Sequence, residues 1–227
     1  MARNWLERKA IKYLARRGYA VKHERPDMLG DLLTPQHLGE FEIATMIDVG
    51  VLTGSPIFYN AFPKAKLVLI DPQPNIAELV APWISKRGKD IILINAGAGS
   101  GESTATLNVS GGASSFLERT EGKHQTVATA TARIAPLDLL IEEAKVPGPF
   151  GLKIDSEGYE MKVIEGATET LKACAFVFAE ISISPRFKDG YVAFDFIAEM
   201  DRRGFKLARV VQHPKTVRFF DGLFIPK

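Results

Sequence analysis

The sequence predicts an α/β domain built on a doubly wound, mostly parallel sheet, and three observations lead to this prediction. Short apolar runs alternate with segments that can form helices, these runs end in polar residues, and the last stretch has the pattern of a hairpin. Continuous apolar runs are typical of parallel strands buried on both faces. The alternation therefore implies a sheet with helices packed on both sides.

Each predicted strand is an apolar run with a polar side chain at or next to its end. The five runs span residues 45–50, 66–71, 90–95, 151–155 and 175–180. The segments between them can supply helices, which we expect at residues 54–62, 74–87, 137–145 and 158–172.

Two regions depart from simple alternation. Residues 101–135 contain runs at 103–109 and 126–134, which we interpret as added strands or as a loop over the sheet edge. Near the C-terminus a helix is expected at 191–203, and the runs 205–211 and 216–225 flank a turn signal, His213-Pro214-Lys215. These two runs predict an antiparallel hairpin that closes one edge of the sheet.

The composition is that of an ordinary soluble protein. The chain has 227 residues, of which 46% are hydrophobic and 25% charged, and a formal net charge of +2. The single cysteine, Cys174, excludes an intramolecular disulfide and a C-x-x-C site. No apolar run approaches the roughly 20 residues that span a bilayer.

The N-terminal segment differs in character from the rest of the chain. We expect a helical extension at residues 1–40, with a basic helix at 5–18, followed by the main domain at residues 41–227. The basic stripe is typical of a solvated helix face, although it could dock an anionic acceptor. The first residues lack the apolar segment of a secretory signal, so we expect a cytoplasmic protein.

The polar residues at the strand ends are the first candidates for a functional site. They are Asp48, Asp71, Asn95, Asp155 and Glu180. In doubly wound folds ligands bind beyond the carboxyl ends of the strands, where these side chains should meet.

The first two strand ends have the pattern of a nucleoside site. Gly50, two residues after Asp48, lets the backbone approach a ligand closely. Asp71 can accept hydrogen bonds from both hydroxyls of a ribose, or it can cap the helix that Pro72 introduces. The clustered glycines of a pyrophosphate site are missing, which favours S-adenosylmethionine (SAM) over a nicotinamide dinucleotide. Asn95 and Ala96 would then flank the adenine.

The stretch 152–160 places three carboxylates around a glycine turn. Asp155 and Glu157 should point to the same side of an extended chain, and their mutual repulsion would raise one pKa and create a proton acceptor. Alternatively, they could bind a divalent cation together with Glu180, although nothing in the sequence specifically indicates a metal. Glu160 is interpreted as a helix-starting acid.

At this point the sequence resembles the FkbM-type SAM-dependent methyltransferases. The resemblance rests on residues 152–167, LKIDSEGYEMKVIEGA, and covers roughly residues 44–226. Further matches occur in the same order along the chain: Asp48-x-Gly50, Asp71-Pro72, Asn95-Ala96, Ala113-Ser114-Ser115, Leu137-Asp138, Phe178-Ala179-Glu180 and Gly204-Phe205.

The resemblance implies a Rossmann-like sheet of the class I SAM methyltransferase type and assigns roles to the site residues. Asp48 and Gly50 would shape the SAM pocket, Asp71 would hold the ribose, and Asn95 with Ala96 would flank the adenine. Asp155 would lie near the methyl donor. One departure is that the family often has Ala-Asn after Asp-x-Gly, where this chain has Val51-Leu52.

The resulting hypothesis is O-methylation of a hydroxyl on a small or sugar-like acceptor. Asp155 or Glu157 would accept the proton, with His124 as a further candidate. Two alternatives stay open: a catalytically degenerate fold that acts as a binding module, and a nicotinamide-dependent oxidoreductase. No aromatic-interleaved basic patch indicates nucleic acid, and the oligomeric state is not predicted.

Overall fold

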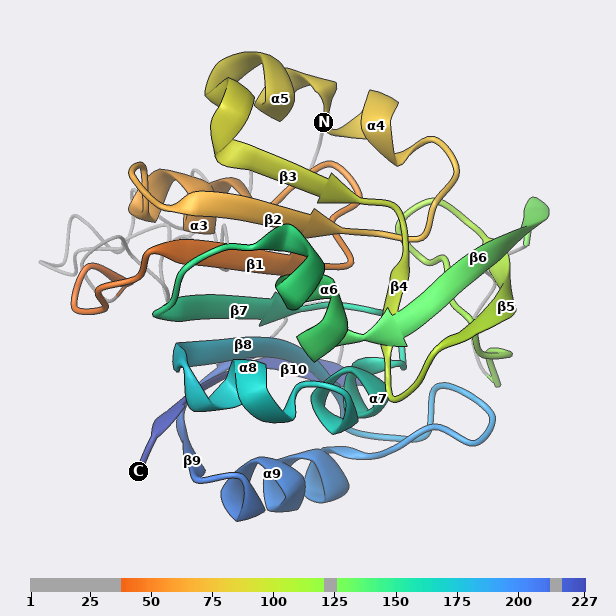
Figure 1. Cartoon of the computed structure of the whole chain (residues 1–227). Coiled ribbons are helices and arrows are strands. Elements are labelled where there is room, and N and C mark those ends of the chain that lie inside the picture. Colours follow the sequence, from red (N-terminus) through yellow and green to blue (C-terminus); the bar gives the residue numbers. More distant parts are fainter. Residues whose placement is uncertain (1–37, 121–125, 213–217) are drawn as a thin grey trace, which may run out of the picture.

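A seven-stranded sheet forms the centre of the molecule, in the order β3-β2-β1-β7-β8-β10-β9 (Figure 1). The computed structural model describes residues 38–120, 126–212 and 218–227. The parallel strands are β1 (Thr45–Val49), β2 (Lys66–Ile70), β3 (Ile91–Ile94), β7 (Phe150–Ile154) and β8 (Cys174–Ser182). β10 (Phe219–Pro226) runs antiparallel to both β8 and β9 (Phe205–Gln212). The predicted mostly parallel sheet with an antiparallel C-terminal strand pair is therefore confirmed.

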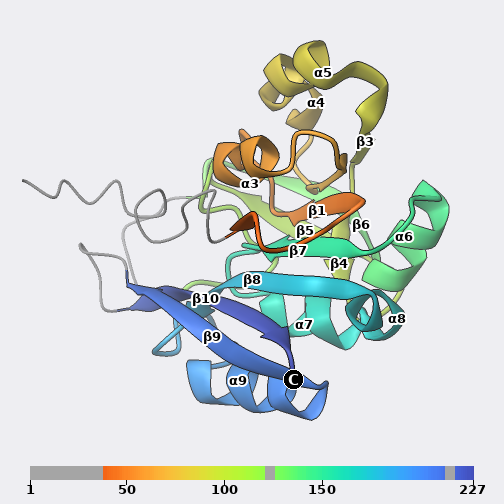
Figure 2. The ribbon, with the colours of Figure 1, turned by 90° about the vertical axis from the view of Figure 1, so that its left-hand side faces the viewer.

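Helices cover both faces of this sheet (Figure 2). One face packs against α3 (Pro56–Ala61), α4 (Ile76–Leu79) and α5 (Ala81–Arg87). The other packs against α6 (Leu137–Ala144), α7 (Glu160–Glu165), α8 (Thr168–Lys172) and α9 (Ala193–Arg202). Neighbouring residues of β1 show the division, because Met46 lies in the first core and Ile47 in the second. The runs in the sequence are continuously apolar because alternate residues of each strand pack into the cores on opposite faces of the sheet.

A second sheet lies beyond the carboxyl ends of the parallel strands (Figure 1). It consists of β4 (Gly97–Gly99), β6 (Ala128–Pro136) and β5 (Ser103–Val109), in that order. The strands expected at 103–109 and 126–134 are thus present. β4 is not apparent in the sequence, because glycine and alanine have low strand propensity.

The segments 74–87 and 158–172 are helical as expected, but each contains two short helices instead of one. Pro82 lies in the first turn of α5. It has no N–H to donate to a carbonyl of α4, so α4 cannot continue into α5. Between α7 and α8, Gly166 packs against the carbonyl of Gly99, and an added Cβ would lie 1.9 Å from that oxygen. A 3₁₀ turn, η1 (Gly88–Asp90), leads from α5 into β3.

Several expectations fall on residues outside the described ranges. They are the extension at 1–40 for all but its last three residues, the basic helix at 5–18, His124 and the turn at residues 213–215. Among the helices in the described ranges, none is long and apolar enough to cross a bilayer.

Candidate active site

A cavity of about 610 Å³ lies at the carboxyl ends of the parallel strands, within the usual size range of small-molecule sites, roughly 300–1,000 Å³. Its walls come mainly from the loops after the strands and from the segment after β5, at residues 49–58, 70–73, 96–98, 111–112, 114–116 and 153–157. β8 and β10 complete the walls with Phe178, Glu180, Phe219 and Asp221. Of the residues proposed from the sequence, the cavity lining includes Gly50, Asp71, Ala96, Asp155 and Glu157. Asp48 is buried behind this lining, and Asn95 is exposed and not part of it.

The loop after β1 reaches the cavity because residue 50 is glycine. Gly50 has a φ of 77°, and a Cβ at this position would lie 1.8 Å from the carbonyl oxygen of Asp155. The loops after β1 and β7 are therefore in direct backbone contact, which no other residue type allows. This contact explains the Asp-x-Gly pattern in structural terms.

Leu52, in the same loop, has a left-handed backbone with a φ of 49°. A leucine in this left-handed conformation costs about 1 kcal/mol, whereas an asparagine adopts it more readily. The Asn that is frequent in the resembling family would suit this backbone. The Leu52 N–H nevertheless donates to the Asp71 carboxylate at 2.9 Å, so the loop keeps its connection to β2.

Asp71 ties together the loops that follow β1 and β2. Its buried carboxylate accepts hydrogen bonds from the backbone N–H groups of Leu52 and Gln73, both at 2.9 Å. Burial raises the pKa of Asp71, while these two amides oppose the rise. Each carboxylate oxygen has a further lone pair, and the group lines the cavity.

Asn95 does not face the cavity. Its side-chain amide donates to the backbone carbonyls of Asp71 and Gln73, each at 2.9 Å, and so supports the loop after β2. Ala96, the next residue, is buried and lines the cavity. The exposed Asn95 thus supports the backbone of Asp71 from outside the cavity.

Lys153 connects Asp48 to the cavity. Asp48 is fully buried, accepts a hydrogen bond from the Tyr59 hydroxyl, and lies 3.0 Å from Nζ of Lys153. The same Nζ donates to the carbonyl of Gly50 at 2.6 Å and lies 3.6 Å from the Asp155 carboxylate. Burial opposes the charge on Lys153, but the surrounding carboxylates, first Asp48 and then Asp155, outweigh burial and raise its pKa.

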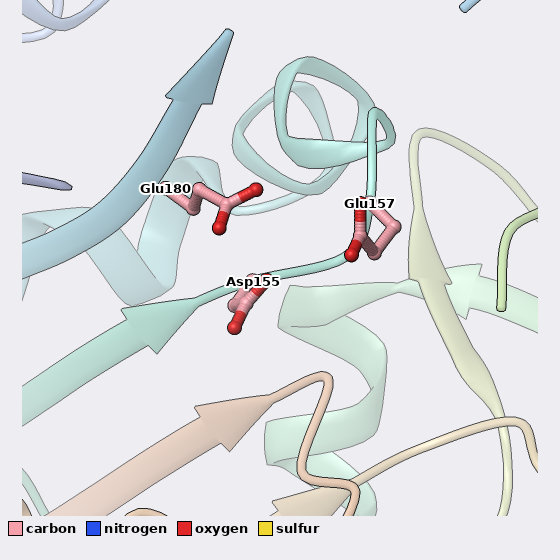
Figure 3. Close-up of side chains that lie close together, drawn as sticks. All are labelled: Asp155, Glu157 and Glu180. Atoms are coloured by element: carbon pink, nitrogen blue, oxygen red, sulfur yellow. The ribbon is translucent and has the colours of Figure 1, made fainter. Parts of the chain in front are cut away.

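Three carboxylates converge at the ends of β7 and β8 (Figure 3). Oxygen atoms of Asp155, Glu157 and Glu180 all lie within 4.8 Å of one another. Burial, followed by the charge of Asp155, raises the pKa of both Glu157 and Glu180. The predicted proximity of Asp155 and Glu157 is present, and Glu180 joins them.

Two arginines partly neutralise this cluster. Glu157 accepts hydrogen bonds from Arg119 at 2.6 Å and from Arg186 at 2.7 Å, and Arg186 also donates to Glu180 at 2.6 Å. Both guanidinium groups lie over the ring of Phe187. A divalent cation bridging the three acids would have to compete with these guanidinium groups, so the donor set favours ion pairing over metal binding.

Glu160 is more than a helix-starting acid. It begins α7, but its carboxylate is buried and accepts hydrogen bonds from the backbone N–H groups of Ser156 and Gly158 and from the Tyr191 hydroxyl. It therefore fixes the turn that carries Glu157. Burial raises the pKa of Glu160 to about 7.

This raised pKa predicts a specific pH dependence of stability. The folded state holds the Glu160 proton more tightly than the unfolded state, so its contribution to stability is complete below about pH 4.5 and is lost as pH rises through about 7. Relative to Glu160→Gln, the wild type should lose up to about 3 kcal/mol of unfolding free energy over this interval. Urea denaturation of both proteins across this range measures the effect, and a pH-independent difference would contradict it.

Some residues of this site were not assigned a role from the sequence. Lys153 is a charged residue inside an apolar run, and this pattern alone was an available signal. Arg119, Arg186 and Asp221 come from loops and from the C-terminal hairpin, where no local pattern indicates the cavity.

The fold is an α/β sheet with a cavity at the strand ends, and the comparisons identify the family. A family model described as the methyltransferase FkbM domain matches residues 48–207. The chain therefore belongs to the FkbM methyltransferase family, which confirms the resemblance seen in the sequence.

Individual relatives agree with this assignment. The chain is 27% identical over 126 residues to the hexuronic acid methyltransferase AglP of Haloferax volcanii. The match covers 56% of this chain and 51% of the relative, so the chain spans about half the length of that protein.

Two solved structures have a similar fold. A methyltransferase FkbM from Methylobacillus flagellatus KT has a TM-score of 0.51 at 14% identity, covering 80% of this chain and 43% of that one. An rRNA methylase from Streptococcus thermophilus has a TM-score of 0.50 at 12% identity, and the match covers 91% of this chain and 99% of that one. At these identities the likeness shows the fold alone.

Proposed function

We propose that the protein is a SAM-dependent methyltransferase that modifies a hydroxyl oxygen of a small or sugar-like acceptor. The proposal rests on one observation: the glycine loop and Asp71 line the same cavity as the acids at the ends of β7 and β8. A nucleoside-sized donor and a small acceptor would then bind next to each other.

The residues on the β1 and β2 side fit the donor. Asp71 has free lone pairs that can accept hydrogen bonds from ribose hydroxyls, and Ala96 leaves room for an adenine ring. Gly50 keeps the loop against β7, so that the methionine portion can lie near Asp155. Asp48 and Asn95 would act indirectly, through Lys153 and the backbone of Asp71 respectively.

SAM supplies a methyl group activated by the positive charge on its sulfur. The chain's task is to orient the acceptor oxygen and to remove its proton. Asp155 suits this role better than Glu157, because its partly exposed carboxylate faces the cavity and, among the described residues, is ion-paired with Lys153 alone, at 3.6 Å. Glu157 already accepts hydrogen bonds from two guanidinium groups.

The acceptor class is supported by the relative rather than by the cavity alone. The named activity of AglP concerns a hexuronic acid, which is a sugar derivative. Carboxylates on the cavity wall can accept hydrogen bonds from several hydroxyls at once, which suits a polyhydroxylated acceptor.

Methyl transfer from labelled SAM to a panel of methyl glycosides, with glucuronic acid for comparison, tests this proposal. Asp155→Asn should lower kcat on a hydroxyl acceptor by about 10²- to 10⁴-fold, which is more than the fall in SAM affinity expected from losing the same negative charge. Glu142→Gln removes a carboxylate on the exposed side of α6 and should leave turnover unchanged. Full turnover by Asp155→Asn would rule out the assigned role.

A further inference from the structure

Asp221 is a carboxylate of the cavity wall to which neither the family match nor the proposed mechanism assigns a role. It lies on β10 and lines the cavity. In the sheet it is directly opposite Glu180 on β8 and Val211 on β9. Like charges directly opposite each other on adjacent strands destabilise a sheet, so the position of Asp221 calls for a compensating partner.

No such partner is present among the described residues. Glu157 and Glu180 are paired with arginines, and Asp71 is bonded to two backbone amides. Asp221 makes no side-chain hydrogen bond or ion pair within the described part of the chain. Its carboxylate is therefore free to interact with a ligand.

The charges around Asp221 leave an excess of negative charge. The cation whose charge acts on Asp221 is Lys153, which is shared with the buried Asp48. The neighbouring Glu180 is paired with Arg186, which also serves Glu157. Burial, followed by the charge of Asp155, raises the pKa of Asp221 to about 7, and Lys153 opposes this rise only in part. A positively charged ligand atom would relieve the excess.

The donor side of the cavity is close to this excess charge. Nζ of Lys153 donates to the Gly50 carbonyl and lies 3.6 Å from Asp155, so the glycine loop and Asp155 share one lysine. Asp155 and the same lysine are the groups whose charges act on Asp221. The field of Asp221 therefore reaches the part of the cavity that the proposed function gives to the methyl donor.

We infer that Asp221 is a specificity-determining residue, whose unpaired carboxylate makes the cavity prefer the positively charged sulfonium of SAM over the neutral thioether of S-adenosylhomocysteine (SAH). The inference rests on the proposed function. SAM and SAH differ only by a methyl group and one positive charge, so the attraction acts on the substrate and disappears once the methyl has been transferred. The site would thus release its product more readily than it releases its substrate.

Isothermal titration with SAM and with SAH, at about pH 6 and about pH 8.5, tests this inference. In the wild type, the ratio of SAM to SAH affinity should rise about tenfold between these pH values, as Asp221 loses its proton. The amino-acid part is common to both ligands, so its own titration cancels in the ratio. Asp221→Asn should lower SAM affinity about tenfold at the higher pH and reduce the pH dependence of the ratio to what Glu160 and the neighbouring acids contribute.

The controls separate the possible outcomes. Unchanged SAH affinity in Asp221→Asn shows that the cavity is intact. Glu142→Gln removes the same charge from the exposed side of α6 and should behave as the wild type. An unchanged ratio in Asp221→Asn, or an equal loss of affinity for both ligands, overturns the inference and leaves the proposed function standing. If the folded wild type binds neither ligand, the proposed function itself fails.

Discussion

Gly50→Ala should abolish SAM binding and lower the free energy of unfolding by about 3 kcal/mol or more. The new Cβ would overlap the Asp155 carbonyl at 1.8 Å, and alanine strongly disfavours a φ of 77°. Relief requires the loops after β1 and β7 to separate, which moves the glycine loop and Asp155 apart. Urea denaturation and SAM titration measure the two effects.

The chain offers a matched control for this variant. Gly101 has open space around its Cα and no positive φ, so Gly101→Ala should change stability by no more than about 0.5 kcal/mol. A Gly50→Ala protein with wild-type stability and SAM affinity would show that the close contact between the two loops is not required.

Lys153→Met should also be strongly destabilising, at about 3–5 kcal/mol of unfolding free energy. It leaves the fully buried Asp48 carboxylate without its cation and removes the hydrogen bond to the Gly50 carbonyl. Thermal or urea denaturation measures the loss. SAM affinity should also fall, because the glycine loop loses its support from β7.

Removing the charge of Asp48 as well shows how much of the stability loss in Lys153→Met is electrostatic and how much is due to packing. The double variant Asp48→Asn/Lys153→Met should recover part of the stability that the single lysine variant loses, since no buried charge is left unpaired. Lys172→Met, which breaks an exposed pair with Glu169, should cost no more than about 0.5 kcal/mol. If the double variant is less stable than Lys153→Met alone, the pairing of Asp48 with Lys153 is not what the lysine contributes.

The sheet was predictable because its physical cause is local. Strands buried on both faces require continuous apolar runs, and those of β1, β2, β7 and β8 are visible in the sequence. Helix continuity was not predictable, since the break at Gly166 depends on contact with Gly99, a residue distant in sequence. β4 lacks the β-branched residues that would have indicated it.

The candidate site also contains residues whose position the sequence predicts and residues whose position it does not. Asp71, Asp155 and Glu157 follow predicted strands, so topology alone brings them to one edge. Asn95 also follows a strand, yet its amide turns back to the carbonyls of Asp71 and Gln73. Side-chain direction depends on which backbone groups lack partners, and a linear pattern does not show this.

Residues that join the site from elsewhere in the chain had no local signal in the sequence. Arg186 precedes α9 in a loop, and Asp221 belongs to a strand whose position between β8 and β9 follows from sheet order alone. Their importance comes from charges that only the folded chain brings together. Lys153 is the exception, because a lysine inside a buried strand calls for a buried partner.

The proposal that this cavity binds the methyl donor is tested by a crystal structure of the chain saturated with SAH. We expect SAH in the cavity, with the ribose hydroxyls within about 3.2 Å of the Asp71 carboxylate and the sulfur turned toward Asp155. A cavity that stays empty at saturating SAH, or a ribose bound away from Asp71, would contradict it.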